Sequence, residues 1–461
     1  MNKSQSSFSI VAEKMRKNGL PDAVIRSFSN YFERVKSGQT GLIPESSITS
    51  VTSLPDAEEF SSDTRLSASG QAALKQTVVL KLNGGLGTGM GLGRAKSLIS
   101  IKQGQSFLDI IAQQALAQGT RQLFMNSFST REDTLDALAG YPALASGIPL
   151  DFLQHKVPKI AQSDLSPVSW SANPDFEWCP PGHGDIYIAL VTSGMLKKLL
   201  DNGYRYVFVS NADNLGAVMD TSILGYFVSG HLPFLMEVTD RTEMDRKGGH
   251  LALTQDGQLI LRESAQCPGD DRTTFENISR HKYFNTNNLW LNLEALERMM
   301  KKSGNTPDLP MIRNSKTVDP RDDNSTPVYH LETAMGSAIG IFKGSAAVRV
   351  SRSRFAPVKN TSDLLAVRSD AYQLTSDYRV VLHPECKQAP LVRLDNNYFK
   401  LLDDMESRFP AGPPSLRNCE SLQVSGDITF GRNVVIEGVV RLSSPPGVPL
   451  KIEDNSRITG D

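Results

Sequence analysis

Residues 78–97 have the sequence VVLKLNGGLGTGMGLGRAKS, and this stretch decides the fold class. The apolar run 78–80 is typical of a buried strand, and it leads into six glycines between Gly84 and Gly93. Glycines allow tight turns with positive φ and let backbone N–H groups approach a ligand closely. Lys96 heads a helix-compatible segment, and a helix N-terminus favours phosphate. We therefore expect a strand, a phosphate-binding loop and a helix in succession.

Two common phosphate-binding motifs are absent from this loop. A P-loop requires glycine before its lysine, whereas Ala95 precedes Lys96. The dinucleotide fingerprint G-x-G-x-x-G fails at each possible start from Gly85 to Gly91. A flexible linker is the simplest alternative, but linkers rarely lie between a buried strand and a helix headed by lysine. The loop therefore indicates nucleotide binding of another kind.

Composition and charge limit the partners and the compartment. The chain has 461 residues and a formal net charge of −1 with mixed charges, so we expect two or three domains and neither nucleic acid nor a membrane surface as partner. Its four cysteines lie far apart without a C-x-x-C pair, which indicates free thiols in a reducing cytosol. The N-terminus lacks the apolar core of a secretory signal, and no segment approaches the roughly 20 apolar residues of a membrane span. We expect a cytoplasmic protein.

Periodicity divides the chain into differently patterned parts. Residues 9–36 have helical spacing, with Asp22 as a possible N-cap after Pro21, and residues 37–76, rich in small and polar residues, should cover the surface. From residue 78, strand-like and helix-like runs alternate, which predicts an α/β fold with a largely parallel sheet. Ligands of such sheets bind beyond the carboxyl ends of the strands. The predicted strands are 78–82, 122–126, 150–153, 186–191, 205–210, 233–238 and 258–262, and the predicted helices are 106–118 and 193–202.

The C-terminal tail has a six-residue period instead. Apolar residues recur there at positions i and i+2 of each hexad, which is typical of a parallel β-helix with three short sides per coil. Pro446 interrupts the pattern once. Such a coil leaves exposed ends suited to self-association. The two interleaved series are Leu422, Ile428, Val434, Val440, Ile452 and Ile458, and Val424, Phe430, Ile436, Leu442 and Val448.

Two polar residues follow predicted strands at the edge where a ligand would bind. Asp213 comes just after strand 205–210, and a carboxylate there suits Mg²⁺, which prefers oxygen ligands beside substrate phosphates. Taken alone, such an aspartate is more often a turn former. Gln154 follows strand 150–153, and its amide offers the donor and acceptor that the imide edge of uracil requires. An edge-strand glutamine bonded to a loop is an equally good explanation.

At this point an ordered set of motifs resembles a known family. L-x-L-N-G-G-L-G-T-x-M-G…K-S at 80–97 looks like the nucleotide-binding loop of the UTP–glucose-1-phosphate uridylyltransferases (UDP-glucose pyrophosphorylases) of the eukaryotic-like type. Arg94 and Ala95 stand where many members carry Gly-Pro, which affects the loop shape and not the role of the lysine. The likeness runs from about residue 78 to 365. The other matching segments are PPGHGD at 180–185, KGGH at 247–250, LRE at 261–263, FNTNN at 284–288, ETAMGSAI at 332–339 and RFAPVK at 354–359.

The resemblance implies a role for each of these segments except 332–339, to which no chemistry is assigned. Lys96 would neutralise the β- and γ-phosphates of UTP, Lys359 would bridge the sugar phosphate and the α-phosphate, and Asp213 would bind Mg²⁺. The implied nucleotide-binding residues are Gly84, Gly85, Gln154 and Gly182, and the implied substrate-binding residues are His183, Asn211, Gly249, Glu263, Asn285 and Asn287.

The implied fold is α/β: a Rossmann-like, GT-A-like nucleotidyltransferase with a mixed sheet and helices on both faces, followed by a left-handed parallel β-helix. The expected parts are a helical arm and surface segment (1–76), a catalytic domain (77–375) and the β-helix domain (376–461). The resemblance implies reversible, Mg²⁺-dependent formation of UDP-glucose and pyrophosphate from UTP and glucose 1-phosphate. The sugar phosphate is already ionised at neutral pH, so no general base is needed and catalysis should rest on positioning and electrostatics. We therefore expect His183 to act as a hydrogen-bond donor.

Several alternatives remain. A UDP-sugar pyrophosphorylase of broader specificity fits the same motifs, whereas the Ala-Gly-Gly-x-Gly-Thr-Arg loop typical of UDP-N-acetylhexosamine enzymes is absent. A non-catalytic sugar-nucleotide sensor would not need both lysines and Asp213. An acyltransferase centred on the coil would need a histidine, and residues 416–461 contain none. Charged residues near the chain end would either join copies of the chain into a homo-oligomer or form a solubilising cap: Lys451, Glu453, Asp454 and Arg457.

Overall fold

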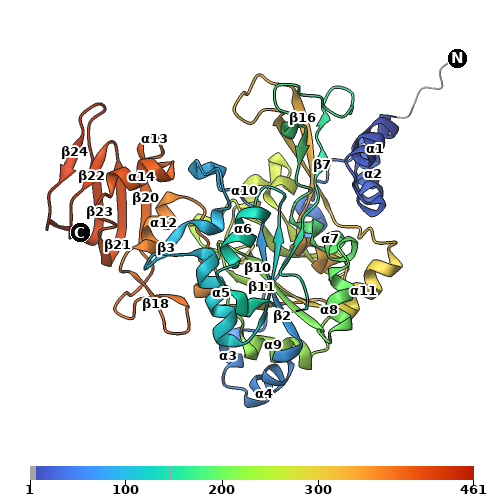
Figure 1. Cartoon of the computed structure of the whole chain (residues 1–461), viewed down its shortest axis with the longest axis horizontal. Coiled ribbons are helices and arrows are strands. Elements are labelled where there is room, and N and C mark those ends of the chain that lie inside the picture. The colour runs from blue at the N-terminus through green and yellow to red at the C-terminus, as the bar shows by residue number, and fades with distance from the viewer. Residues whose placement is uncertain (1–6, 146, 461) are drawn as a thin grey trace.

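The computed structural model describes residues 7–145 and 147–460, and its centre is a ten-stranded sheet (Figure 1). In spatial order, seven of its strands are β1 (Ile48–Ser50), β12 (His250–Thr254), β14 (Tyr283–Asn292), β10 (Tyr206–Asn211), β2 (Thr77–Asn83), β5 (Arg121–Asn126) and β6 (Asp151–Leu153). The other three are β11 (Phe234–Asp240) beside β14, β17 (Ala346–Arg349) beside β11, and β13 (Leu259–Arg262) beside β12.

The sheet is mixed, with a parallel half and an antiparallel half. β2 runs parallel to both β10 and β5, and β5 runs parallel to β6. β14 runs antiparallel to β10 and β11, and β12 and β13 form a hairpin. A hairpin needs only a short turn, whereas parallel neighbours need a crossover connection. The expectation of a largely parallel sheet therefore holds from β10 to β6, around the glycine loop, and for the pair β11 and β17.

Helices cover both faces of the sheet, because neighbouring residues of each strand point to opposite sides. Val78 and Leu80 of β2 pack into one core cluster, and Val79 packs into another. The first face is covered by α7 (Ile186–Thr192), α8 (Met195–Asp201) and α11 (Leu293–Lys302), with α1 (Ser7–Lys17) and α2 (Asp22–Lys36) in the same cluster. The second face is covered by α4 (Thr64–Ala73), α5 (Phe107–Gln118) and α9 (Thr221–Ser229).

Two local expectations are wrong. Residues 186–191, expected as a strand, form α7. The run IYIALV is apolar all round, and periodicity alone does not separate a buried strand from a short buried helix. The expected helix at Lys96 is only a 3₁₀ turn, Lys96–Leu98, because β3 (Ser100–Lys102) follows at once and pairs with β4 (Gln105–Ser106). The glycine loop therefore leads into a short turn and a hairpin.

The N-terminal part also differs from its expectation in two respects. Pro21, and not Asp22, is the N-cap of α2, and Asp22 is its first residue. Residues 37–76 do more than cover the surface, since β1 joins the central sheet and α4 packs on α9. A Cβ on Gly70 would lie 1.7 Å from the Thr221 carbonyl oxygen, so the close approach of these two helices requires glycine there.

The tail consists of short parallel strands. Within it, Leu422 pairs with Val440 and Val424 with Leu442, each pair within one predicted apolar series. Beyond residue 446 the predicted register is wrong, because Phe430 pairs with Ile452 and Ile436 with Ile458, which belong to different series. Val448 is an exception, because it lies in a turn after Pro445 and is 55% exposed. One sheet has the order β20 (Leu391–Leu394), β21 (Ser415–Ser425), β23 (Val435–Ser443) and β25 (Arg457–Thr459), and a second pairs β22 (Ile428–Phe430) with β24 (Leu450–Ile452).

Smaller elements complete the chain. A three-stranded antiparallel sheet lies beside the central sheet, and further short helices and hairpins connect the parts (Figure 1). All four cysteines are free, and within the described ranges no helix is both long and apolar enough to cross a membrane. These elements are β15 (Met311–Thr317), β16 (Pro327–Thr333), β8 (Ile160–Ala161), β7 (Val157–Pro158), β9 (Trp178–Cys179), β18 (Tyr372–Leu374), β19 (Val380–Leu382), α3 (Ala57–Phe60), α6 (Arg131–Leu138), α10 (Arg272–Phe275), α12 (Thr361–Arg368), α13 (Asn396–Phe399) and α14 (Leu402–Arg408).

Candidate active site

The predicted site begins where parallel strands of the central sheet end. β2 leads into Gly84, β6 leads into Gln154, and β10 ends at Asn211 shortly before Asp213. Because β10, β2, β5 and β6 are parallel neighbours, their carboxyl ends share one edge of the sheet. Residues from three distant parts of the sequence therefore meet at the edge where ligands of α/β sheets bind.

At one end of this edge, Gln154 contacts two glycines. Its side-chain Nε2 donates to the Gly182 carbonyl oxygen at 3.1 Å. A Cβ on Gly84 would lie 2.9 Å from Gln154 Oε1, whereas a Cβ on Gly85 would meet open space. Gly182 has a φ of +78°, and a Cβ there would lie 2.3 Å from the Thr333 carbonyl oxygen. The backbones of Gly84 and Gly182 therefore both lie close to the Gln154 amide. Both positions require glycine, because a Cβ on Gly84 would clash with Gln154 and a Cβ on Gly182 would clash with Thr333.

The Asp185 side chain, which the sequence alone did not indicate as a site residue, connects the end of β6 to the turn that contains Gly182. Asp185 accepts from the backbone N–H of His155 at 2.7 Å and lies 2.9 Å from the ring Nδ1 of the same residue. His155 directly follows Gln154, and Asp185 ends the turn that contains Gly182. The end of β6 and the turn are thus held in one arrangement by a single buried side chain.

His183 is held as a neutral ring. The backbone N–H of Met335 donates to His183 Nδ1 at 2.9 Å, so Nδ1 is the acceptor and Nε2 carries the proton. Burial lowers the pKa of His183 to about 4. The backbone N–H of Thr333 also donates to the Pro181 carbonyl oxygen at 3.0 Å. The segment 332–339, which carried no assigned chemistry, thus supports this turn from behind and leaves His183 able to donate from Nε2.

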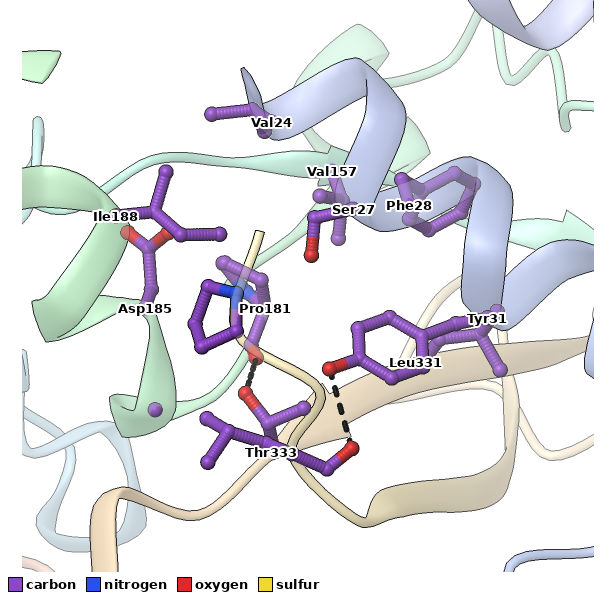
Figure 2. Close-up of a pocket in the computed structure, with 13 residues that line it drawn as sticks. Val24, Ser27, Phe28, Tyr31, Val157, Pro181, Asp185, Ile188, Leu331 and Thr333 are labelled. Atoms are coloured by element: carbon purple, nitrogen blue, oxygen red, sulfur yellow. Dashed lines mark hydrogen bonds between the residues drawn. The ribbon is translucent and has the colours of Figure 1, made fainter. Parts of the chain in front are cut away.

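A small cavity lies behind the turn, between α2 and residues 181–185 (Figure 2). Its volume is about 30 Å³, and Tyr31 beside it donates to the Leu309 carbonyl oxygen at 3.2 Å. Pockets for small-molecule ligands occupy several hundred Å³. This cavity is therefore too small for a nucleotide.

Lys96 and Asp213 form an ion pair in the middle of the edge. Lys96 Nζ lies 2.6 Å from Asp213 Oδ2, and the two side chains are 15% and 24% exposed. The backbone N–H of Lys96 donates to the Gly85 carbonyl oxygen at 3.1 Å, which closes the glycine loop on itself. The loop predicted to hold phosphate and the aspartate predicted to bind metal are thus in direct contact.

Lys359 lies close to this pair but differs from Lys96 in its environment. Its side chain is exposed, and among the described residues no acidic group pairs with its ammonium. Its backbone is fixed on both sides: Val358 N–H donates to the Asp213 carbonyl oxygen at 3.1 Å, and Lys359 N–H donates to Asp363 Oδ2 at 2.7 Å. The loop is therefore anchored while the charged end is available to a ligand.

A carboxylate and two amides gather at the other end of the site. A Cβ on Gly249 would lie 2.5 Å from Glu263 Oε2, so glycine is needed for this carboxylate to fit. Burial raises the pKa of Glu263, while a hydrogen bond from Asn285 and the charge of Lys359 oppose that rise. Asn285 Nδ2 donates to Asn287 Oδ1 at 3.0 Å, and Asn287 has a φ of +59°. The expected sugar-binding residues from three segments therefore form one cluster.

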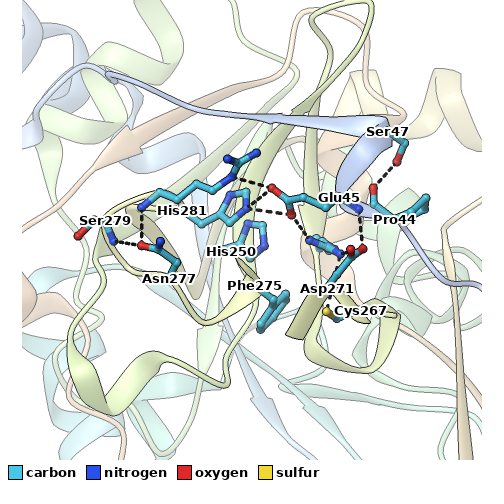
Figure 3. Close-up of polar contacts among 12 residues, drawn as sticks. Pro44, Glu45, Ser47, His250, Cys267, Asp271, Phe275, Asn277, Ser279 and His281 are labelled. Atoms are coloured by element: carbon cyan, nitrogen blue, oxygen red, sulfur yellow. Dashed lines mark hydrogen bonds and ion pairs between the residues drawn. The ribbon is translucent and has the colours of Figure 1, made fainter. Parts of the chain in front are cut away.

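A buried ionic cluster surrounds Arg262, which directly precedes Glu263 in the chain (Figure 3). Arg262, whose side chain is fully buried, lies 2.6 Å from Glu45 and 3.0 Å from Asp271. Glu45 also lies 3.0 Å from His281 Nε2, and the His250 ring stacks on His281 with centroids 3.8 Å apart. Glu45 belongs to the segment that the sequence indicated only as surface. The N-terminal segment thus helps to position β13, which ends at Arg262 directly before Glu263.

Comparisons with known proteins identify the family of the chain. The family model described as UTP–glucose-1-phosphate uridylyltransferase matches residues 25–437. A UTP–glucose-1-phosphate uridylyltransferase from Solanum tuberosum is 40% identical over 395 residues, which is 84% of this chain and 80% of the relative. A probable one from Schizosaccharomyces pombe is 39% identical over 405 residues, 84% of this chain and 78% of the relative.

Solved structures are similar over nearly the whole chain. UDP-glucose phosphorylase from Trypanosoma brucei has a TM-score of 0.90 and 45% identity, covering 99% of this chain and 100% of that one. A mutant of UDP-glucose pyrophosphorylase from Leishmania major in complex with UDP-glucose has a TM-score of 0.92 and 43% identity, covering 99% of both chains. Together with the family model, which matches most of the sequence, these likenesses confirm the resemblance of the glycine loop and its companion motifs: the chain belongs to the UTP–glucose-1-phosphate uridylyltransferase family.

Proposed function

We propose that this chain transfers a uridylyl group from UTP to glucose 1-phosphate, releasing pyrophosphate and forming UDP-glucose in a reversible reaction. The observation that carries the proposal is the order of groups along one edge of the sheet. First comes an amide with two glycines, next a lysine–aspartate pair, and last a carboxylate with two amides. This spatial order matches the order of base, phosphates and hexose in the proposed substrates. Family membership supplies the reaction class.

Gln154 would recognise the base. Its Nε2 already donates to the Gly182 carbonyl oxygen, and Oε1 is turned toward Gly84. An oxygen in that position accepts the N3–H of uracil, whereas the N3 of cytosine has no hydrogen and would present a lone pair. The arrangement therefore favours UTP over CTP.

Asp213 and Lys96 would bind the phosphates and the metal. Within the described ranges no group of three acidic, histidine or cysteine side chains could hold a metal ion alone. A single carboxylate nevertheless fits Mg²⁺, which is usually held by one or two carboxylates together with substrate phosphates and water. When bound through Asp213 and the triphosphate, Mg²⁺ would supply positive charge and a template for the phosphates. Lys96, released from Asp213, would then pair with the β- and γ-phosphates.

The chemical step needs positioning more than proton transfer. An oxygen of the sugar phosphate attacks the α-phosphorus, and the bond from that phosphorus to the oxygen bridging to the β-phosphate breaks, so pyrophosphate leaves with the electron pair. Lys359 would stand where the two phosphates meet and reduce their repulsion. His183 would donate from Nε2, since its Nδ1 is occupied by Met335 N–H. Glu263, Asn285 and Asn287 would hold the hexose hydroxyls.

An activity panel tests the function directly. Purified chain with UTP, Mg²⁺ and glucose 1-phosphate should release pyrophosphate, and galactose 1-phosphate or N-acetylglucosamine 1-phosphate should react much more slowly. Equal rates for several sugar 1-phosphates would indicate the broader pyrophosphorylase instead. Tight binding of UDP-glucose without any pyrophosphate release would indicate a sensor.

For the rest of the chain, we propose the division 1–76, 77–375 and 376–461 and a cytosolic location, which the free cysteines favour. The parallel registers of the tail support a short left-handed β-helix with β25 at its open edge. Assembly of copies through that edge is also a proposal. Arg457 pairs with Glu437, and Lys451 with Glu453, so these charges already have partners within the chain. Deletion of 441–461 should lower the mass in light scattering if copies associate there, and a monomeric full-length protein would contradict it.

A further inference from the structure

Three segments that carry proposed site residues are joined below the site by one buried polar network. The turn after β10 carries Asp213, the loop after β17 carries Lys359, and β14 carries Asn285 and Asn287. At the centre of the network is Asn214, whose side chain is almost fully buried, with 1% of the residue exposed. It directly follows the proposed metal ligand, yet it points into the protein and not toward substrate.

Asn214 joins the Asp213 turn to the Lys359 loop with both ends of its amide. Its Nδ2 donates to the Arg354 carbonyl oxygen at 3.0 Å, and its Oδ1 accepts from the Ala356 N–H at 3.1 Å. Val358 N–H donates to the Asp213 carbonyl oxygen at 3.1 Å. Pro357 lies between these two donors and forms an isolated antiparallel bridge with Asn214, so backbone and side-chain contacts together join the two segments.

The same network reaches the sugar end through Glu237. This carboxylate is fully buried and accepts two hydrogen bonds from Arg354, at 2.9 and 2.6 Å. It also accepts from Asn288 Nδ2 at 3.0 Å and from Trp290 Nε1 at 2.9 Å. Asn288 follows Asn287, where the pairing of β11 with β14 shifts register. Arg354 and Asn288 both contact Asn214, so the ion pair and the bulge of β14 are parts of one connected unit.

We propose that Asn214 is a positioning residue for uridylyl transfer, which sets the Lys359 ammonium relative to Asp213. The inference rests on the proposed function, because it assigns Asn214 an effect through those two residues. No described acidic side chain forms an ion pair with Lys359, whose ammonium lies 5.8 Å from the centre of the Phe355 ring. Asn214 accepts from Ala356 N–H and Asp363 accepts from Lys359 N–H, so these two side chains hold the backbone segment that carries both Phe355 and Lys359. Asparagine suits the task because its amide carries a donor, used for Arg354 O, and a separate acceptor, used for Ala356 N–H.

Steady-state kinetics of Asn214→Ala test the inference. A misplacement of about 1 Å can cost on the order of 10²-fold in rate, so kcat should fall by about 10- to 100-fold. The KM for UTP should change less than about threefold, because Gln154 and Gly182 do not touch the network. Asn292→Ala is the control: it removes a half-buried amide that caps the start of α11 by accepting from Ala295 N–H at 2.9 Å. The control should lose comparable thermal stability and keep its kcat.

A double-mutant comparison separates positioning from a general effect. If Asn214 acts through Lys359, Asn214→Ala combined with Lys359→Ala should be no slower than Lys359→Ala alone. Multiplicative losses, or a normal kcat for Asn214→Ala, would overturn the inference while the function stands. A wild-type chain that releases no pyrophosphate would instead refute the proposed function. If Asn214→Ala does not fold, Asn214→Asp carries the same test, because it keeps the acceptor for Ala356 and loses the donor to Arg354.

Discussion

The base end and the phosphate end of the site are prepared to different degrees. At the base end, Gln154 is bonded to Gly182, and His183 is bonded to Met335 N–H, so both side chains already have one orientation. At the phosphate end, Lys96 and Asp213 form an ion pair with each other, and the Lys359 side chain is exposed. The first end is ready for its ligand, whereas the second must exchange an internal ion pair for contacts with metal and triphosphate. Under the proposed function, we infer that UTP would be selected through its base and that its phosphates would then displace that pair.

The largest effect is expected from Lys359. Removing its ammonium in Lys359→Ala should lower kcat on the order of 10²–10³-fold, because the charge is needed where two anionic phosphates meet. The KM for UTP should change much less, since the base end is untouched. Lys343→Ala removes a lysine from another loop and serves as control. Near-normal turnover of Lys359→Ala would remove this residue from the mechanism.

Asp213→Asn should mainly change the metal requirement. The amide keeps an oxygen but loses the charge, so the Mg²⁺ concentration for half-maximal rate should rise by about tenfold or more. The substitution also frees Lys96 from its ion pair. Titrating Mg²⁺ at saturating UTP measures the shift. An unchanged metal dependence would mean that Asp213 is a turn residue and that the ligand lies elsewhere.

Gln154→Ala should weaken the selection of the base. An unpaired buried polar group costs about 1–3 kcal/mol, so the ratio of kcat/KM for UTP over CTP should fall by about 10- to 100-fold. Gln162→Ala, which removes an amide bonded to the Val328 carbonyl oxygen, is the matched control. A preference that survives in Gln154→Ala would point to readout by the backbone of Gly84, Gly85 and Gly182.

Acid should destabilise the protein partly through His183. An exposed histidine in the unfolded chain binds a proton below its ordinary pKa of 6.5, whereas burial lowers the pKa of His183 in the folded chain to about 4. The unfolded state therefore binds more protons between these values, and the free energy of unfolding falls as pH falls through that window. Between pH 7.5 and pH 5 the loss should be about 2 kcal/mol.

Urea unfolding of the wild type and of His183→Asn at both pH values measures this contribution. The variant should lose about 2 kcal/mol less than the wild type on acidification. His330, whose pKa is likewise lowered to about 4 by burial, contributes with the same sign in both proteins and cancels in the difference. Equal losses in the two proteins would show that His183 is not buried as a neutral ring.

The sequence predicted the parts of the site that depend on local order. The strand before Gly84, the amide after β6 and the aspartate after β10 each follow a recognisable apolar run, and the sheet brings their ends together. The supporting residues gave no such signal. Asn214, Glu237, Asp185 and Glu45 all bond to partners far away in the chain. Glu237 lies within the predicted strand 233–238, and nothing next to it in the sequence indicates its partners Arg354, Asn288 and Trp290. The strand prediction for residues 186–191 was wrong for a related reason: packing in the folded protein, and not the local apolar pattern, makes this run helical.

Crystal structures of the chain without ligand and with UTP and Mg²⁺ test the difference between the two ends most directly. Gln154 Nε2 should remain within hydrogen-bond distance of the Gly182 carbonyl oxygen, now 3.1 Å away, while uracil occupies the space beside it. Lys96 should leave Asp213, from which it is now 2.6 Å away, and contact the β- and γ-phosphates. The contradicting result would be a complex in which Lys96 still pairs with Asp213 and residues 154–185 have rearranged instead. The base end would then not be preorganised, and the phosphates would not displace the ion pair.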